Sequence, residues 1–325
     1  MINPTLTQKK SANPTYTLSE RAKNIFQLIY REQHSSGGDD YEPKIKVSSL
    51  ISKMSFYYEK IRNTVEYKEE NLLRKNAIER ILKREIVIQG VFQEVKNEEL
   101  SKRLLTELIR ATYLPNNKIP EAKIDEVARV IAKFKLLRKI SIENAKDPEL
   151  RRILTHWVLS MAASEIEEIL RKNEVTEAVV AYMFDEMGKN VNMENVPEYA
   201  EDKDVQIYLA IYRNFLKFDR DMLGFILLKY FNSDWLRADE SRIGVAGRNI
   251  DDLHRKINEQ LDHPLSRQLD KIASRYTVLF TILREVIEDD PVAAYNNIKN
   301  DPIAFTRTIK MVCEKKYKKV GSTLW

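Results

Sequence analysis

The chain has 325 residues, of which 43% are apolar and 32% are charged, and its formal net charge is +5. This balance excludes an intrinsically disordered chain, which would have fewer apolar residues, and a membrane-embedded bundle, because charge this dense needs water-facing surface on nearly every helix. Eight glycines, ten prolines and one cysteine leave few places for glycine-rich phosphate loops, disulfides or cysteine-based metal sites.

Apolar residues recur at helical spacing along most of the sequence, and strand-like patterns are missing. We therefore predict an all-α protein, either a multi-helix bundle or an irregular helical array, with no significant β-sheet. A chain of this length has room for two domains or for one long array.

Turn-forming residues and breaks in the helical pattern divide the sequence into four predicted parts. Residues 1–16 are expected to be a disordered lead. Residues 17–40 are expected to form an N-terminal helical arm, opened by the capping-box pattern Thr17-Leu-Ser-Glu20, and a flexible loop. A helical domain over 41–190 then precedes an acidic, turn-rich linker. A second helical domain with a basic C-terminus follows over 204–325.

Three Asp-Pro pairs, at 147–148, 290–291 and 301–302, predict helix starts. The aspartate can accept a hydrogen bond from a free amide, and a proline costs nothing in the first turn. Long apolar segments over 205–231 and 272–287 predict the core of the second domain, and Leu279 is among the expected core residues.

A basic helix is predicted over 60–84. Lys68 and Lys75 occupy seam positions where a dry helical interface would carry apolar residues. The segment has twice as many basic residues as glutamates, which indicates either a solvated face with local ion pairs or a surface for an acidic partner. Its basic residues are Lys60, Arg62, Lys68, Arg74, Lys75, Arg80, Lys83 and Arg84.

The segment Ile243-Gly-Val-Ala-Gly-Arg-Asn-Ile250 matches the glycine-loop pattern with which KH domains clamp a nucleic-acid backbone. Arg242 and Arg248 flank Gly244 and Gly247 and keep nucleic-acid binding open as an alternative. Val245 and Ala246 replace the usual polar residues between the glycines, so an ordinary loop between helices is the competing interpretation.

Evidence for catalysis is sparse. No phosphate-loop, dinucleotide or nucleophile-elbow motif occurs. His254 and His263 are nine residues apart and would face opposite sides of one helix, so they cannot share a metal ion without a break between them. We expect no catalytic residues, no cofactor and no metal. An enzyme with a helical carboxylate and histidine site near Asp251, His254 and Glu259 is the third alternative.

The C-terminus is strongly basic. Between 307 and 319, six cations face a single acidic residue, Glu314. Such a helix can bind anionic lipid, an acidic protein or a phosphate backbone, or it can stabilise its own C-terminal dipole. The basic residues are Arg307, Lys310, Lys315, Lys316, Lys318 and Lys319, with Tyr317 among the last four.

Residues 57–84 resemble the opening helical segment of a family of uncharacterised helical proteins from candidate phyla radiation bacteria. In that family a basic segment similar to residues 315–319 leads into hydrophobic membrane segments. The resemblance implies a helical fold and no catalytic residues. The printed sequence reaches Trp325 without such a segment, so we expect a shortened or a soluble version of this pattern.

These observations favour a non-enzymatic binding or scaffolding protein, cytoplasmic and without signal peptide or transmembrane segment, that can be peripheral to a membrane through its C-terminal helix. A protein is the first expected partner, an anionic membrane surface and nucleic acid are alternatives, and no small-molecule substrate is expected. The candidate interaction surface comprises Lys60, Lys68, Arg74, Lys75, Lys83, Arg84, Arg307, Lys310, Lys315, Lys316, Tyr317, Lys318 and Lys319.

Overall fold

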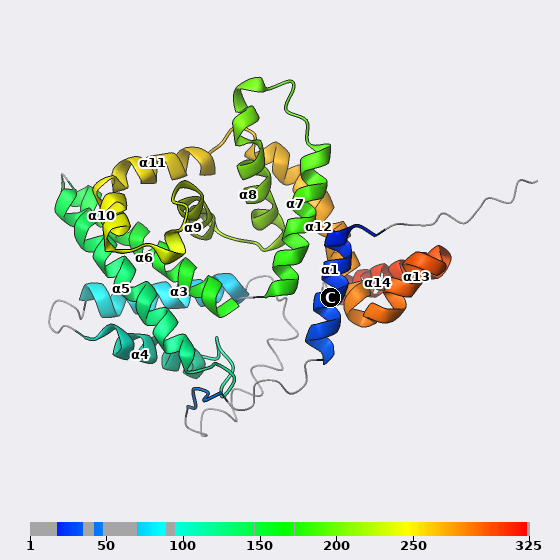
Figure 1. The fold of residues 1–325 in the computed structure, drawn as a ribbon, viewed down its shortest axis with the longest axis horizontal. Coiled ribbons are helices and arrows are strands. Elements are labelled where there is room, and N and C mark those ends of the chain that lie inside the picture. The colour runs from blue at the N-terminus through cyan, green and yellow to red at the C-terminus, as the bar shows by residue number, and fades with distance from the viewer. Residues whose placement is uncertain are drawn as a thin grey trace, which may run out of the picture. The chain divides into compact units, whose positions relative to one another are not determined.

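The computed structural model describes the chain over residues 18–34, 42–47, 70–88, 95–145, 147–171 and 173–323, with the backbone alone at 317 and 319–323. Within these ranges the fold is helical (Figure 1). The only β interaction among them is an isolated antiparallel bridge between Lys44 and Pro120. The predicted all-α helical array is therefore confirmed.

The described residues form two compact units, and each unit is assembled from separate stretches of sequence. Unit 1 takes its residues from 18–34, 174–187 and 275–323. Unit 2 takes its residues from the described part of 42–173 and from 188–274.

Unit 2 contains most of the helices. Helix α6 lies at its centre and packs against α3, α5 and α9, while α10 packs against α5 and α11 against α9. Its elements are α3 (Glu70–Leu82), a π-helical turn (Lys83–Ile88), α4 (Asn97–Arg110), α5 (Ala122–Asn144), α6 (Pro148–Arg171), short 3₁₀ helices (Pro197–Asp202 and Trp235–Arg237), α8 (Lys203–Phe215), α9 (Arg220–Phe231), α10 (Glu240–Arg248) and α11 (Ile250–Leu261).

Unit 1 is smaller and takes part of two helices that begin or end in unit 2. Helix α1 packs against α13, and α13 packs against α14. The elements are α1 (Glu20–His34), most of α7 (Glu174–Asn190), the second part of α12 (Ser266–Asp289), α13 (Pro291–Asn300) and α14 (Pro302–Thr323).

The predicted Asp-Pro helix starts are confirmed. Helices α6, α13 and α14 each begin at the proline of such a pair. The preceding aspartates, Asp147, Asp290 and Asp301, each accept a hydrogen bond from the amide three residues ahead, at 2.8, 2.8 and 3.0 Å. Each bond satisfies one of the free amides of the first helical turn.

The predicted division into domains over 41–190 and 204–325 does not match the two units. Residues on both sides of the proposed linker belong to unit 2, because α9 packs on α6 and α10 packs on α5. Helical periodicity shows which face of a helix is apolar, but it does not show which other helix covers that face.

Helix α1 is not a separate arm. Its apolar side, formed by Ala22, Ile25, Phe26 and Ile29, is buried, and the Phe26 ring meets the Tyr295 ring of α13 edge-on at 5.6 Å. The helix begins at Glu20, and the Ser19 hydroxyl accepts the cap hydrogen bond from the Ala22 amide at 3.2 Å; Thr17 of the predicted capping box lies outside the described residues. The predicted lead over 1–16 lies outside the described residues.

The predicted core segments are confirmed only in part. Helices α8 and α9 bury Ile211, Tyr212 and Phe225 as expected. In α12, however, Val278 and Leu279 are 58% and 62% exposed. The prediction for Leu279 followed from the apolar residues on more than one face of this helix, but among the described residues no other element covers the side that carries Val278 and Leu279.

Candidate binding surface

Arg74 does not belong to an exposed surface, contrary to the sequence-based expectation. Its side chain is buried, with 7% exposure, and it donates two hydrogen bonds of 2.7 Å to the two carboxylate oxygens of Glu167 on α6. Glu167 is fully buried, and this burial raises the pKa of its carboxyl group despite the neighbouring guanidinium. The pair therefore joins α3 to α6 inside unit 2.

Lys75 is also buried, with 1% exposure, and it contacts carboxylates on two helices. Its Nζ lies 2.6 Å from Asp221 and 3.2 Å from Asp219 at the start of α9, and 3.1 Å from Glu79 on its own helix. Burial alone would lower the pKa of Lys75, but the hydrogen bond to Asp221 and the surrounding negative charges raise it overall. The residue is a cationic contact between helices.

The prediction of an interaction surface at Arg74 and Lys75 is therefore wrong, for a physical reason. A cation at a seam position can be buried if other helices supply carboxylates there, and Glu167, Asp219 and Asp221 are far from α3 in sequence. Lys60 and Lys68 lie outside the described residues, and their part in an interaction surface stays a prediction.

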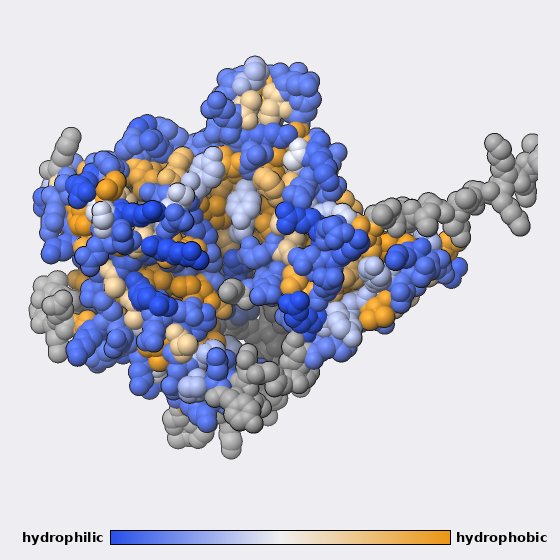
Figure 2. All heavy atoms as spheres, in the orientation of Figure 1, coloured by the Kyte–Doolittle hydropathy of each residue, from blue (hydrophilic) through white to orange (hydrophobic). Residues whose placement is uncertain are grey.

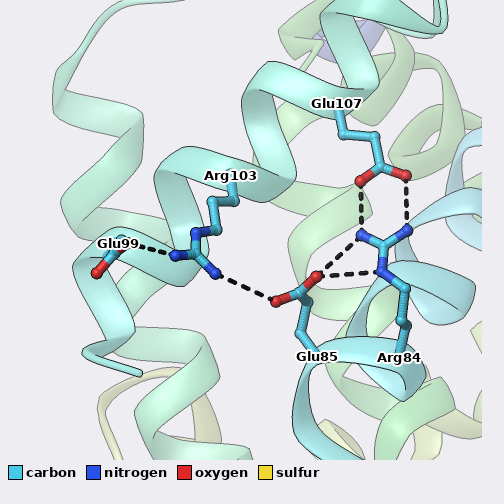
Figure 3. Close-up of polar contacts among 5 residues, drawn as sticks. All are labelled: Arg84, Glu85, Glu99, Arg103 and Glu107. Carbon is cyan, nitrogen blue, oxygen red and sulfur yellow. Dashed lines mark hydrogen bonds and ion pairs between the residues drawn. The ribbon is translucent and has the colours of Figure 1, made fainter. Parts of the chain in front are cut away.

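Of the remaining basic residues of this segment, Lys83 is exposed and Arg84 is engaged in a local ion network (Figure 3). The Arg84 guanidinium donates to both Glu107 oxygens, at 2.6 and 3.2 Å, and to Glu85 at 3.0 and 3.1 Å. Arg103 extends the network from Glu85 to Glu99. The hydrogen bond from Arg84 lowers the pKa of Glu107. These charges satisfy one another and offer little attraction to a partner.

The glycine motif is not a loop. Gly244 and Gly247 lie inside α10 and are buried. A Cβ added at Gly247 would meet Ile140 Cγ2 of α5 at 2.8 Å, so this glycine permits the close approach of two helices. Arg242 forms an ion pair with Asp234 at 3.2 Å, and the Arg248 guanidinium lies beside Gly244. Both the KH-like loop and the ordinary loop between helices are wrong at this position.

His254 and His263 contact different residues and do not form a common site. His254 meets the Trp157 ring edge-on at 5.3 Å, and burial lowers the pKa of its imidazole although Asp251 opposes this shift. His263 is buried; its Nδ1 accepts from the Leu265 amide at 3.2 Å, and its Nε2 lies 3.3 Å from Asp202. Within the described residues, no cluster of three or more histidine, cysteine or carboxylate side chains has an arrangement that could hold a metal ion.

The second basic cluster does form a surface, along α14. At 3.6 residues per turn, Ile303, Arg307, Lys310, Met311, Glu314 and Lys318 fall within about 100° of arc. All six are exposed, and the apolar Ile303 and Met311 are 57% and 61% exposed. We call these six residues, with the adjacent exposed Lys315, the α14 outer face.

The charge of the α14 outer face is largely uncompensated. In the part of the chain that the structure describes, no ion pair engages Arg307, Lys310, Lys315 or Lys318. Lys316 differs, because it points to the other side of α14 and pairs with Glu285 of α12 at 2.6 Å. The side chains of Tyr317 and Lys319 lie outside the description. On the face of the molecule drawn in Figure 2, apolar atoms lie among hydrophilic ones over the α13–α14 region.

The opposite side of α14 forms one wall of a pocket of about 400 Å³ in unit 1. Its floor includes the buried Ile25 and Phe26 of α1 and Ile287 of α12, while Phe305 and Ile309 of α14 are half-buried in the wall. No charged side chain lines it. Sequence analysis missed this pocket because it arises where five helices fail to close, although the apolar spacing of α1 and α14 indicated the faces involved.

Comparisons with protein families, with curated proteins and with solved structures found no match to this chain. The resemblance of residues 57–84 to a bacterial family stays a prediction, and residues 57–69 lie outside the described ranges. Among the described residues, every helix is too short or too polar to cross a membrane.

Proposed function

We propose that this protein is a non-enzymatic binding module that attaches peripherally to an anionic membrane surface through the α14 outer face. The observation that carries the proposal is the combination, on one exposed face, of four cations without ion-pair partners among the described residues and two exposed apolar side chains, Ile303 and Met311. Elsewhere in the described chain, Arg74 and Lys75 of the candidate interaction surface are buried in ion pairs and Arg84 is joined in its local network, which leaves Lys83 as a single exposed cation of that surface.

Electrostatic attraction supplies the larger part of the expected affinity. Each lysine or arginine near an anionic leaflet contributes roughly 1 kcal/mol. Arg307, Lys310, Lys315 and Lys318 need not break an ion pair with a described residue before they bind. Glu314 subtracts from the total and lies on the same face. A membrane interaction of moderate strength that is sensitive to salt follows from this balance.

The exposed apolar residues favour a lipid surface over nucleic acid. A phosphate backbone rewards cations, but it offers no apolar environment to Ile303 or Met311, whereas the boundary between head groups and acyl chains offers both. The glycine motif, which was the independent indication of nucleic-acid binding, lies within a helix.

The test is co-sedimentation of the full chain with vesicles of phosphatidylcholine, with and without phosphatidylserine. The triple variant Arg307→Glu/Lys310→Glu/Lys318→Glu should bind the anionic vesicles more than about 100-fold more weakly, because three contributions of roughly 1 kcal/mol are lost. The matched control, Lys102→Glu/Lys118→Glu/Arg129→Glu, makes the same change in net charge at exposed positions of unit 2 and should bind like the wild type.

A second variant separates lipid from nucleic acid. Ile303→Ser/Met311→Ser should weaken vesicle binding by about 10-fold through lost apolar contact, and it should leave any salt-sensitive RNA binding unchanged. Equal vesicle binding by the α14 triple variant and the unit 2 control would contradict the proposal. Tight RNA binding without vesicle binding would indicate that the α14 outer face binds nucleic acid instead of a membrane.

A further inference from the structure

The pocket of unit 1 has the size and lining of a ligand site. Its volume of about 400 Å³ falls within the range of roughly 300–1,000 Å³ that is usual for small-molecule pockets. Eleven of its thirteen lining residues are apolar or aromatic, and the exceptions are Ser19 and Thr306. An occupant must therefore be mainly hydrocarbon.

Three lining residues carry a hydroxyl group, Ser19, Tyr182 and Thr306, and two of these hydroxyls make a local hydrogen bond. Ser19 Oγ accepts from the Ala22 amide at 3.2 Å, and Thr306 Oγ1 donates to the Pro302 carbonyl at 2.8 Å. None of the buried polar atoms that lack a partner in the described chain belongs to a lining residue. Hydroxyl groups are thus the only side-chain polar groups among the lining residues, and none of them can form an ion pair, so a charged group of the ligand would have to lie outside the pocket mouth.

Charge is available at that mouth. Thr306 is the exposed lining residue of α14, and Lys310 follows it by four residues, so the two lie on the same side of the helix, one turn apart. Lys310 is exposed and forms no ion pair with any described residue. A tail lying against Phe305 and Ile309 would leave its head group beside a lysine.

We propose that the unit 1 pocket binds a single-chain lipid with an anionic head group, with the hydrocarbon tail in the pocket and the head group at Lys310. The inference rests in part on the proposed function, because it uses the inner side and the edge of the helix whose outer face is assigned to the membrane. It adds a lipid class to that function: a free fatty acid or an acidic lysophospholipid such as lysophosphatidate, which share a single chain and an anionic head.

The test uses the full chain and a dansyl-labelled undecanoic acid in solution, below its aggregation concentration and without vesicles. We expect saturable binding of one probe per chain with an increase in fluorescence. A probe with the same tail and a trimethylammonium head should bind about 5- to 10-fold more weakly, because Lys310 then repels the head group. Palmitate and lysophosphatidate should both displace the probe, whereas a monoacylglycerol should displace it poorly; their relative potencies distinguish the two lipid sources.

A pocket-filling variant locates the binding. Thr306→Trp places an indole at the exposed rim and should weaken probe binding at least 10-fold. Asn296→Trp, on an exposed position of α13 that does not line the pocket, should bind like the wild type. Helix content measured by circular dichroism checks that both variants fold. Lys310→Gln should weaken binding of the carboxylate probe, and it should leave binding of the trimethylammonium probe unchanged or make it tighter.

The two proposals fail in different ways. Absence of saturable probe binding, or equal binding by Thr306→Trp and the wild type, overturns the pocket assignment even if vesicles still bind. Probe binding that is lost in Thr306→Trp supports the pocket even if the charge-reversal variant shows that α14 does not bind vesicles. Tighter binding of the cationic probe than of the carboxylate would overturn the role of Lys310.

Discussion

At Arg74 and Lys75, two adjacent cations on α3 reach carboxylates on two different helices. Arg74 pairs with Glu167 of α6, and Lys75 pairs with Asp219 and Asp221 at the start of α9. Adjacent residues on a helix point about 100° apart, so two consecutive residues of α3 can form ion pairs with two different neighbouring helices. The position and the direction of each buried charge therefore specify how α3 is placed in unit 2.

Gly247 determines how closely α10 approaches α5. Gly247→Ala would place a Cβ 2.8 Å from Ile140 Cγ2, which requires α10 and α5 to move apart. Overpacking of this kind costs about 1–3 kcal/mol, and the better helix propensity of alanine returns at most about 1 kcal/mol. We expect a net destabilisation of about 1–2 kcal/mol, measured by urea unfolding.

Gly188 is the matched control for this substitution. It lies in α7, and an added Cβ there would meet nothing within 4 Å. Gly188→Ala should raise the free energy of unfolding by about 0.5–1 kcal/mol, because alanine loses less backbone entropy than glycine. If the two variants changed stability in the same direction, the close packing of α10 on α5 would not be the reason for glycine at position 247.

At the scale of elements, local rules explain where helices begin and end, and long-range contacts decide their neighbours. The Asp-Pro pairs specify their helix starts within three residues of sequence, so they were predictable. The burial of Lys75 depends on Asp219 and Asp221, almost 150 residues away. The α14 cations were predictable as a cluster, but their separation into an outer face and the inward-facing Lys316 required the partner Glu285.

The Arg74–Glu167 pair tests how α3 and α6 are joined. Glu167→Leu should destabilise the protein by about 3–5 kcal/mol, because the buried Arg74 guanidinium then keeps only its longer ion-pair contact to Glu70, at 3.3 Å. The double variant Arg74→Met/Glu167→Leu removes both charges and keeps the side chains long and apolar. It should recover most of the loss, since burial already opposes the ionised form of Glu167 and raises its pKa.

Thermal and urea unfolding of the two single variants and the double variant completes this cycle. Arg74→Met alone should also be strongly destabilising, because the buried Glu167 carboxylate then loses both hydrogen bonds from its paired guanidinium and keeps only the electrostatic influence of Arg171. A double variant no more stable than the worse single variant would contradict the expectation, and it would assign to the pair a role in the geometry of the helices that apolar packing cannot replace.

At the scale of the whole molecule, the two units interleave along the sequence. Unit 1 needs α1, part of α7 and the C-terminal helices, so its core is closed by residues that are more than 250 positions apart, as Phe26 and Tyr295 are. No contiguous fragment contains it. The pocket and the α14 outer face both belong to this unit, so the proposed binding functions share the less extensively packed part of the chain.

Removal of α14 should therefore loosen unit 1 and leave unit 2 folded. A chain ending at Asn300 loses Phe305 and Ile309 from the pocket wall and the Lys316–Glu285 ion pair. We expect the amides of α1 and α13 to lose hydrogen-exchange protection by about 2 kcal/mol or more, in line with lost apolar burial. The amides of α5 and α6, whose described contacts lie in unit 2, should keep theirs. A chain ending at Glu314 keeps both wall residues and should retain most of the protection in α1 and α13. Equal loss of protection in both units would show that they unfold together, and the pocket would then be a feature of one cooperative fold instead of a separable binding unit.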